Sequence, residues 1–303
     1  MKRKIAFYGN NSRLGEFLLK KWCAKNYKKY EIHLIFDNKN ESNNLSKISK
    51  AESIILLNRD LIKILVEKNI SDIFLLEPSK LLSNSYKKEN FVENNISIYI
   101  ENTDFLKTHL DKYLSNLSLE KNNLPIPKFQ LLSEFILNPK IDFPIIIKPN
   151  RGYASKNIIF LNNERELYEK LNKHIKQENF IVQEVLKGKE YSCTIVKNVD
   201  LKYMSIERKS INEYTVSSEF KNKYNFHLKK WIPNIGNLGF EYALNIQYIL
   251  TENGPKIFEI NPRLGTAETH RFEYSFDAID LLLTSSIKST KYKEGSYSIN
   301  NLI

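Results

Sequence analysis

Residues 245–265 read Asn-Ile-Gln-Tyr-Ile-Leu-Thr-Glu-Asn-Gly-Pro-Lys-Ile-Phe-Glu-Ile-Asn-Pro-Arg-Leu-Gly. Two apolar runs flank an Asn-Gly pair, which is a strong short-range signal for a β-hairpin. In the second run Glu259, Asn261 and Arg263 recur at every second position, so an extended strand points all three to one face. A carboxylate, amide oxygens and a guanidinium on one sheet face suit a divalent cation and phosphate better than a core. The stretch therefore indicates ATP chemistry.

The register of this hairpin decides whether Gln247, in the first run, joins the same group. A two-residue loop at residues 253–254 pairs Gln247 with Ile260 and faces it away from Glu259. A three-residue loop at residues 252–254 pairs Gln247 with Glu259 instead. A metal site on this hairpin therefore predicts the three-residue loop or a β-bulge.

Composition places the chain among globular proteins. At 303 residues, with 42% apolar and 27% charged residues, it can bury a substantial core and is expected to form at least two domains. No apolar run approaches the ~20 residues of a membrane span, and the N-terminus is expected to be a first strand rather than a signal peptide. Cys23 and Cys193 lie far apart and predict neither a disulfide framework nor a metal site, which favours a cytoplasmic location.

The net charge of +11 raises the question of nucleic-acid binding. Of the 46 basic residues only eight are arginine, so 38 are lysine, and these are scattered among many Asn and Ile residues. Because no dense basic tract interleaved with aromatics occurs, we interpret the lysines as solvated faces and do not expect nucleic acid as a partner.

The first hundred residues alternate short apolar runs with polar helical stretches. Strands are expected at 5–8, 32–36, 53–57, 73–76 and 96–100, with helices at 13–24 and 60–68, which predicts a small parallel α/β layer. Gly9 and Gly15 follow the first strand, but the Gly-x-Gly-x-x-Gly pattern is absent, so a nicotinamide or flavin cofactor is the less favoured interpretation.

The rest of the chain predicts a mixed α and β arrangement. One helix is expected over 104–122, closed by Pro125 and Pro127, and others near 134 and over 164–176. The expected strands cover residues 142–149, 179–186, 191–196 and 201–207. Residues 210–230 are polar and predict an irregular loop.

Polar groups upstream of the hairpin fit a nucleotide. Lys148 closes an apolar strand and is followed by a polar loop, residues 150–157, whose backbone N–H groups could surround phosphate oxygens. An apolar segment at residues 183–186 could offer backbone groups to adenine, and Glu190 beyond it could accept ribose hydroxyls. A lysine that closes a strand is, however, also commonly a solvated edge residue.

At this point the chain resembles the ATP-grasp superfamily, and most closely the branch that contains the carbamoyl phosphate synthase large-subunit modules and small carboxylate–amine ligases. The resemblance covers roughly residues 104–270. It rests on the order of the motifs Asp111-Lys112, Pro125-Ile-Pro127, Ile-Lys148-Pro, the loop 151–157, Gln-Glu184-Val-Leu, Gly188-Lys-Glu190-Tyr, Asn-Ile-Gln247 and Glu259-Ile-Asn261-Pro-Arg263.

The resemblance implies an α/β (α+β) fold in which a Rossmann-like pre-ATP-grasp domain, residues 1–105, precedes a two-lobed ATP-grasp domain, residues 106–303. The lid would span about 118–182 and the C-terminal lobe about 183–303. ATP would lie between them.

The resemblance also implies roles for individual residues. Phosphates would be contacted by Lys112, Lys148, Arg151, Gly152 and Ser155. The adenine would lie against Gln183, Glu184, Val185 and Leu186, with Glu190 on the ribose. Mg²⁺, or Mn²⁺ in its place, would be held by Gln247, Glu259 and Asn261, and Arg263 would steady the transferred phosphoryl group.

Two positions depart from the family pattern. The phosphate loop is usually glycine-rich, whereas here Gly152 stands alone, so Lys148 and Arg151 are expected to share the phosphate contacts. Gln247 occupies a metal position where many ligases carry an acid; Gln also occurs there in the synthase branch.

Arginine placement gives separate support. Four of the eight arginines, Arg151, Arg208, Arg263 and Arg271, fall in the region of the expected site, and we predict that Arg208 and Arg271 bind the carboxylate to be activated. Chance clustering is the alternative. For His270, local hydrogen bonding is favoured over a role as a base or a substrate contact.

The resemblance implies an ADP-forming ligase. ATP would phosphorylate a small-molecule carboxylate, and an amine would attack the acyl phosphate to form an amide, under a lid that keeps water away. A kinase-like or carbamate-forming enzyme, or a non-catalytic nucleotide-binding module, is the alternative. A homodimer is left open, and neither substrate is identified by the sequence.

Overall fold

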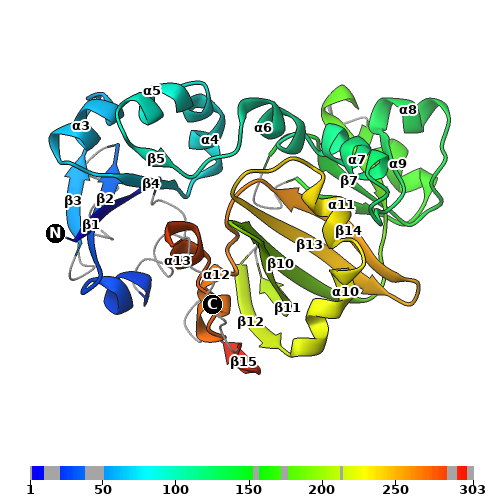
Figure 1. Cartoon of the computed structure of the whole chain (residues 1–303). Coiled ribbons are helices and arrows are strands. Elements are labelled where there is room, and N and C mark those ends of the chain that lie inside the picture. The colour runs from blue at the N-terminus through cyan, green and yellow to red at the C-terminus, as the bar shows by residue number, and fades with distance from the viewer. Residues whose placement is uncertain are drawn as a thin grey trace.

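Three β-sheets organise the described part of the chain in the computed structural model (Figure 1). The structure describes residues 2–9, 21–37, 51–152, 157–171, 177–211, 214–284 and 292–298. The sheets follow one another along the sequence, and their strand orders are β3-β2-β1-β4-β5, β6-β9-β7-β8 and β14-β13-β10-β11-β12-β15.

The N-terminal sheet is parallel throughout, so the expected parallel α/β layer is confirmed. Its strands are β1 (Arg3–Tyr8), β2 (Tyr30–Phe36), β3 (Glu52–Ile55), β4 (Asp72–Leu75) and β5 (Ser97–Ile98). The helices that follow strands are α3 (Leu61–Glu67), α4 (Pro78–Ser85) and α5 (Lys88–Glu93). Parallel sheets are normally covered on both faces, and here the helices pack on one face while the other contacts the C-terminal part of the chain. The helix expected over 13–24 lies largely outside the described residues.

The single helix expected over 104–122 is wrong, because the structure contains two helices, α6 (Thr103–His109) and α7 (Lys112–Lys121). Asp111 is extended, and its side chain accepts a hydrogen bond from the Leu114 backbone N–H at 3.0 Å, which caps α7. Asp111 also forms an isolated bridge with Arg151. The interruption places Lys112 in the first turn of α7, beside the second sheet.

The second sheet is formed by strands between residues 129 and 184. Its strands are antiparallel: β6 (Phe129–Leu131), β7 (Ile145–Pro149), β8 (Ile159–Leu161) and β9 (Phe180–Glu184). In β7, Ile145 and Ile147 are buried in a core that includes residues of α8 (Leu132–Leu137) and α9 (Glu164–Leu171). Because side chains alternate along a strand, Lys148 lies on the opposite face. A single turn of 3₁₀ helix, η1 (Gln177–Asn179), precedes β9, and the end of the helix expected over 164–176 lies outside the described residues.

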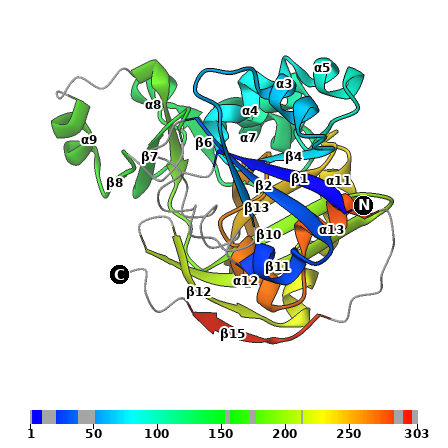
Figure 2. The ribbon, with the colours of Figure 1, turned by 90° about the vertical axis from the view of Figure 1, so that its left-hand side faces the viewer.

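The third sheet is antiparallel. Its strands are β10 (Lys189–Lys197), β11 (Leu201–Ile211), β12 (Tyr214–Phe220), β13 (Ala243–Thr251), β14 (Gly254–Asn261) and β15 (Gly295–Ser298), which pairs with β12 at one edge (Figure 2). One face packs against η2 (Asn222–Asn225), α10 (Phe226–Lys229) and α11 (Ile232–Gly236), and the remaining helices are α12 (Glu268–Glu273) and α13 (Ala278–Leu283).

The irregular loop expected over 210–230 is also wrong. Apart from residues 212–213, which lie outside the described part, this segment forms β12, η2 and α10. Phe220, Tyr224 and Leu228 are buried. These three apolar side chains fix a segment whose remaining residues are polar, and composition alone did not reveal them.

The first and third sheets are tied together by one carboxylate. Glu101 is buried, and its oxygens accept hydrogen bonds from the backbone N–H groups of Tyr242 and Ala243, each at 3.0 Å. This contact holds the end of the N-terminal layer against the start of β13. No described helix has the length and apolar character needed to cross a bilayer, and both cysteines are buried free thiols.

Candidate active site

The β13–β14 hairpin brings the expected metal ligands to one face. Gln247 pairs with Glu259, and Asn245 pairs with Asn261, as the metal hypothesis required. The register comes from a bulge rather than from the loop, because Thr251 pairs with Gly254 around a two-residue turn at residues 252–253. A register shift after Gln247 then leaves Phe258 as an extra residue in β14. The predicted bulge is confirmed, whereas neither loop considered from the sequence forms.

The bulge also positions a cation. Lys148, at the end of β7, is only 6% exposed, and its Nζ donates to the carbonyl oxygen of Phe258 at 3.2 Å. Burial lowers the pKa of the Lys148 ammonium to about 8, the nearby Glu259 carboxylate acts in the opposite direction, and Lys112 lowers it further. Two sheets are thereby joined at the point where phosphate was expected.

The acidic and amide groups of β14 remain available for a ligand. Within the described residues, the side chains of Glu259 and Asn261 have no hydrogen-bond or ion-pair partner. Arg263 follows two residues later, its Nη1 donates to the Leu264 carbonyl at 2.7 Å, and burial lowers its pKa while Glu259 raises it. Carboxylate and amide oxygens are the donor set that Mg²⁺ prefers, so these residues fit a magnesium ion.

Helix α7 and the loop after β7 supply two further cations. Lys112 Nζ donates to the carbonyl oxygen of Gly152 at 2.9 Å. Arg151 Nε donates to Asp111 Oδ2 at 3.2 Å, yet 76% of the arginine side chain is exposed, so its guanidinium can contact a ligand. Ser155, expected in the same loop, lies outside the described residues.

The expected adenine segment, residues 183–186, begins within the last two residues of β9. Glu184 forms two hydrogen bonds with Lys128. Its backbone N–H donates to the Lys128 carbonyl at 3.1 Å, and its Oε1 accepts the Lys128 N–H at 2.9 Å. Val185 and Leu186 are half-buried. Gln183 is buried, and its Nε2 has no partner within the described residues. An unpaired buried amide is costly, so this nitrogen supports a ligand next to the segment.

A glycine sets the path from this segment into β10. Gly188 has a φ of +149°, and a Cβ added there would lie 2.1 Å from the carbonyl oxygen of Leu250. Only glycine permits that approach of two backbones. The close packing directs Glu190, two residues on, towards the sheet face that carries Gln247.

Arg208 connects the expected ribose and metal positions. It is 9% exposed, its Nε donates to Glu190 Oε1 at 2.9 Å, and its Nη2 donates to Gln247 Oε1, also at 2.9 Å. The carboxylate expected on the ribose and the amide oxygen expected on the metal therefore share one guanidinium. Arg208 bridges these two groups here, in place of the substrate carboxylate expected from the sequence.

Arg271 belongs to the interior. It is 0% exposed, and it donates to the Met204 carbonyl at 3.1 Å, to Glu268 Oε1 at 2.7 Å and to Ser192 Oγ at 2.8 Å. Because all three guanidinium nitrogens are occupied, we do not retain Arg271 as a carboxylate-binding residue. In the sequence it could not be distinguished from Arg263, because burial depends on how α12 packs.

His270 is a buried hydrogen-bonding residue, which agrees with the favoured interpretation. Its Nε2 lies 2.8 Å from the Thr215 carbonyl, and its Nδ1 lies 2.8 Å from Ser218 Oγ. Burial lowers its pKa to about 4, so the ring is neutral near pH 7.

A cavity of about 270 Å³ is lined by residues of α7, of the loop after β7 and of β14. It brings together six of the predicted residues: Lys112, Arg151, Gly152, Glu259, Asn261 and Arg263. The other predicted residues that the structure describes lie outside its lining. The cavity adds residues that sequence reasoning missed, among them Ser79, Leu82, His109, Ser115 and Asn116. The spacing of Lys112, Ser115 and Asn116 on one helical face was the available signal.

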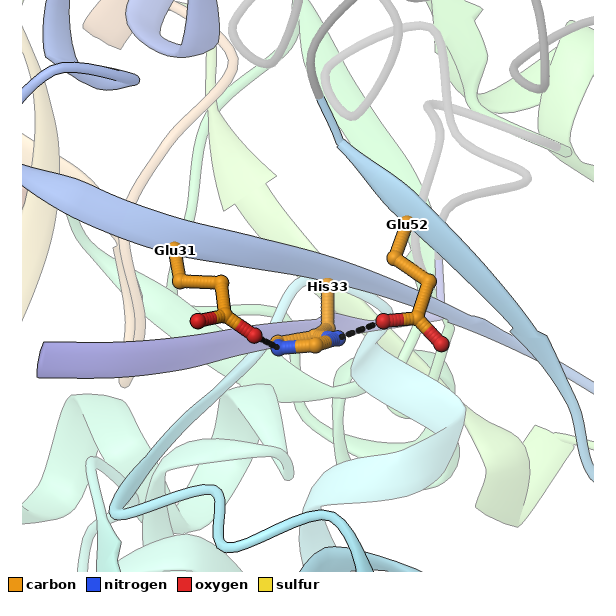
Figure 3. Close-up of side chains that lie close together, drawn as sticks. All are labelled: Glu31, His33 and Glu52. Carbon is orange, nitrogen blue, oxygen red and sulfur yellow. Dashed lines mark ion pairs between the residues drawn. The ribbon is translucent and has the colours of Figure 1, made fainter. Parts of the chain in front are cut away.

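A second group with metal-ligand chemistry lies in the N-terminal sheet, where His33 is positioned between Glu31 and Glu52 (Figure 3). Each ring nitrogen is 3.3 Å from a carboxylate oxygen. Lys4 already contacts Glu31 at 3.0 Å, and Lys68 contacts Glu52 at 2.7 Å. The two lysines balance the two carboxylates, and none of these residues lines the cavity, so the group is separate from the candidate active site.

Comparisons with known proteins agree with this geometry. A D-alanine–D-alanine ligase of Petrotoga mobilis is 30% identical over 176 residues, which span 52% of this chain and 58% of the relative. The chain thus covers less than two thirds of that relative.

Two solved structures have a similar fold. The biotin carboxylase domain of 2-oxoglutarate carboxylase from Hydrogenobacter thermophilus, solved with MgADP and bicarbonate, is similar with a TM-score of 0.72 at 13% identity, over 97% of this chain and 72% of that one. An L-amino acid ligase from Bacillus licheniformis has a TM-score of 0.67 at 13% identity, over 93% and 73%. The ATP-grasp domain family matches residues 110–267, which include the β13–β14 hairpin, the second sheet and α7. The chain belongs to the ATP-grasp family.

Proposed function

We propose that the chain is an ADP-forming ligase that joins a small-molecule carboxylate to an amine through an acyl phosphate. The observation that carries this proposal is the hairpin register, which sets Gln247 opposite Glu259 beside the buried Lys148. Within the described residues, the Glu259 and Asn261 side chains have no hydrogen-bond or ion-pair partner. We also propose domain limits of 1–105 and 106–303, with a lid at about 118–182.

Residues of the β13–β14 hairpin, of the second sheet and of α7 would hold the nucleotide and its ion. Glu259 and Asn261, with Gln247, would hold Mg²⁺, which would offset the negative charge of the phosphates. Lys148 and Lys112 would contact the phosphates, Arg151 would approach them from the exposed side, and the segment 183–186 would take the adenine.

The proposed reaction has two steps. A carboxylate oxygen attacks the γ-phosphorus of ATP, the bond to the bridging oxygen breaks, and ADP leaves. The amine nitrogen then attacks the acyl carbon and loses a proton, and phosphate leaves as the amide forms. Arg263 and Lys112, which line the cavity with Glu259, would stabilise charge that develops on the transferred phosphoryl group.

Arg208 would exchange one hydrogen-bond partner for another when the ligand binds. In the structure it occupies Gln247 Oε1, so Gln247 can contribute that oxygen to a cation only by sharing it or after Arg208 turns away. A carboxylate or phosphate oxygen near Glu190 would give the guanidinium a replacement partner. We propose that ligand binding shifts Arg208 from Gln247 to such an oxygen.

The names of two similar proteins support ligation as the reaction. The matched Petrotoga mobilis protein is a D-alanine–D-alanine ligase, and one protein of similar fold is an L-amino acid ligase. The structure solved with bicarbonate favours a second candidate, in which bicarbonate is the carboxylate and the product is a carbamate.

The test is ADP release from MgATP with pairs of acids and amines, with the product mass measured. Release that requires both partners, and a product mass equal to their sum less water, supports the ligase. Release with bicarbonate and an amine supports carbamate formation, and release with an acid alone indicates a kinase-like enzyme. Nucleotide binding without ADP release under any pair would contradict catalysis. Glu259→Gln, which removes one ligand charge, serves as the inactive control.

A further inference from the structure

The cavity also has a wall of residues that the proposed reaction does not use. This wall, formed by the start of α4 and by the junction of α6 and α7, contains Pro78, Ser79, Leu82, His109, Leu110 and Asn116. The same cavity is lined by Lys112, Glu259 and Arg263, which together define its phosphate end. A substrate whose carboxylate reaches the phosphate end would therefore rest its remaining atoms against this wall.

Asn116 carries an unused donor in the wall. It follows Lys112 by four residues on α7, so the two side chains share one helical face. The Asn116 residue is only 3% exposed, and its Nδ2 has no hydrogen-bond partner within the described part of the chain. A buried donor without a partner costs roughly 1–3 kcal/mol. An acceptor oxygen on a bound molecule would remove that cost.

The other residues of this wall carry no charge. His109 Nδ1 lies 3.0 Å from Ser115 Oγ, and burial lowers the pKa of His109 to about 4, so its ring is neutral near pH 7. Leu82 and Leu110 supply apolar surface. Two lysines that line the cavity flank this wall in sequence: Lys112 donates to the Gly152 carbonyl, and Lys107, which is half-exposed, lies 3.8 Å from Asp104, which offsets its charge.

We propose that Asn116 determines substrate specificity by donating to an acceptor oxygen on an uncharged substituent of the carboxylate substrate. This inference rests on the proposed function, because the substrate must place its carboxylate at the phosphate end. A cationic or anionic substituent against this wall would lose its hydration without gaining a counter-charge, which is strongly unfavourable. The substrate class is therefore small acids with a neutral, oxygen-bearing substituent.

The probes are three small acids that differ in the charge of one substituent: 3-hydroxybutyrate, 3-aminobutyrate and methylsuccinate. Their binding to the full chain loaded with MgADP is measured by calorimetry, so the readout does not depend on turnover. We expect 3-hydroxybutyrate to bind at least ~10-fold more tightly than either charged acid. Equal or tighter binding of a charged acid, or no binding of any of the three, would overturn the inference.

Asn116→Asp tests the donor directly. It replaces the amide N–H by an acceptor, so the affinity for 3-hydroxybutyrate should fall ~10-fold and the preference between the hydroxy and amino acids should reverse. Asn116→Ala removes the donor without adding charge and should weaken 3-hydroxybutyrate alone, with MgADP affinity retained. Leu117→Ala, at the exposed neighbour on α7, is the matched control and should change neither affinity. An unchanged ratio in both Asn116 variants contradicts the role of Asn116.

The two proposals fail in different ways. Selective binding of 3-hydroxybutyrate without ADP release from any acid and amine would overturn the ligase and retain the specificity wall. ADP release that prefers acids with a charged substituent would retain the ligase and overturn the wall.

Discussion

Lys148 shows how burial changes a single charge in this protein. A lysine that ends a strand is usually solvated, but here the ammonium is enclosed between β7 and the bulge of β14 and donates to the Phe258 carbonyl. Removing it from water lowers its pKa to about 8. The position therefore holds a poorly hydrated cation, which suits the phosphate contact that we propose for it.

Nucleotide affinity should depend on the charge of Lys148. Because its pKa is lowered to about 8, the free protein loses this cation as the pH rises through that value, whereas an ordinary lysine stays charged to about pH 10.4. We expect the affinity for MgADP to fall above about pH 8 and Lys148→Met to bind it ~10–100-fold more weakly, without that pH dependence. Calorimetric titration across pH checks both, with Lys121→Met as the exposed control. The same pH profile in Lys148→Met would exclude Lys148 as its source.

At the scale of elements, a single extra residue in β14 sets the face of the site. Phe258 has no partner in β13, and the strand beyond it presents Glu259 and Asn261 beside Gln247. A shift of one residue exchanges the two faces of a strand. The interruption between α6 and α7 has a similar effect, since it places Lys112 at a helix start beside Gly152.

Inserting one alanine between Glu259 and Ile260 should abolish the Mg²⁺ dependence of nucleotide binding. Because successive side chains of a strand alternate, the insertion turns Asn261 from the face that carries Glu259, unless a second bulge absorbs it. Deleting Phe258 is the control, because it restores a continuous ladder and keeps Gln247 opposite Glu259. MgADP and metal-free ADP titrations, with thermal melting to verify folding, measure the effect. A folded insertion variant that keeps its Mg²⁺ dependence would show that the shared strand face does not position the ligands.

Asp111 should stabilise the α6–α7 junction mainly as a helix cap. Its Oδ1 accepts the Leu114 N–H at 3.0 Å, and its Oδ2 accepts Asn150 Nδ2 at 2.8 Å. We expect Asp111→Ala to lower the free energy of unfolding by about 0.5–2 kcal/mol. Asp111→Asn can still cap and should lose less. Urea unfolding compares the two, and equal losses would point to the negative charge rather than the cap.

At the scale of the whole molecule, buried neutral histidines connect stability to pH. His109 lies at the α6–α7 junction and His270 in α12, and burial lowers the pKa of each to about 4. In the unfolded chain both take up a proton below about pH 6.5. Protonation therefore favours the unfolded state between these values, and stability is retained above this window and lost as the pH falls through it.

We expect the free energy of unfolding to fall with decreasing pH between about 6.5 and 4, by up to ~1.4 kcal/mol per pH unit for each histidine. His270→Gln should reduce that slope by about the share of one histidine. Urea unfolding at several pH values gives the slope for both proteins. An identical slope in the variant would show that His270 does not contribute.

Local pattern sufficed for much of the fold. Apolar periodicity predicted the parallel N-terminal layer and the strands β7, β9, β10 and β13, because these segments carry their pattern within a few residues. The pattern missed the break at Asp111, whose bridge to Arg151 comes from a distant segment. It also missed β12 and α10, whose few apolar residues are buried by long-range packing.

The chemistry of the proposed nucleotide site was readable in the chain, because ligand types at period two on a strand share a face whatever surrounds them. The sequence therefore determined Glu259, Asn261 and Arg263 as a group, and it required a bulge or an odd loop for Gln247. Which of these forms, that Arg271 is internal while Arg263 lines the cavity, and that Asn116 lines the same cavity all depended on tertiary packing. Burial and pairing are properties of contacts between distant segments, and no local pattern encodes them.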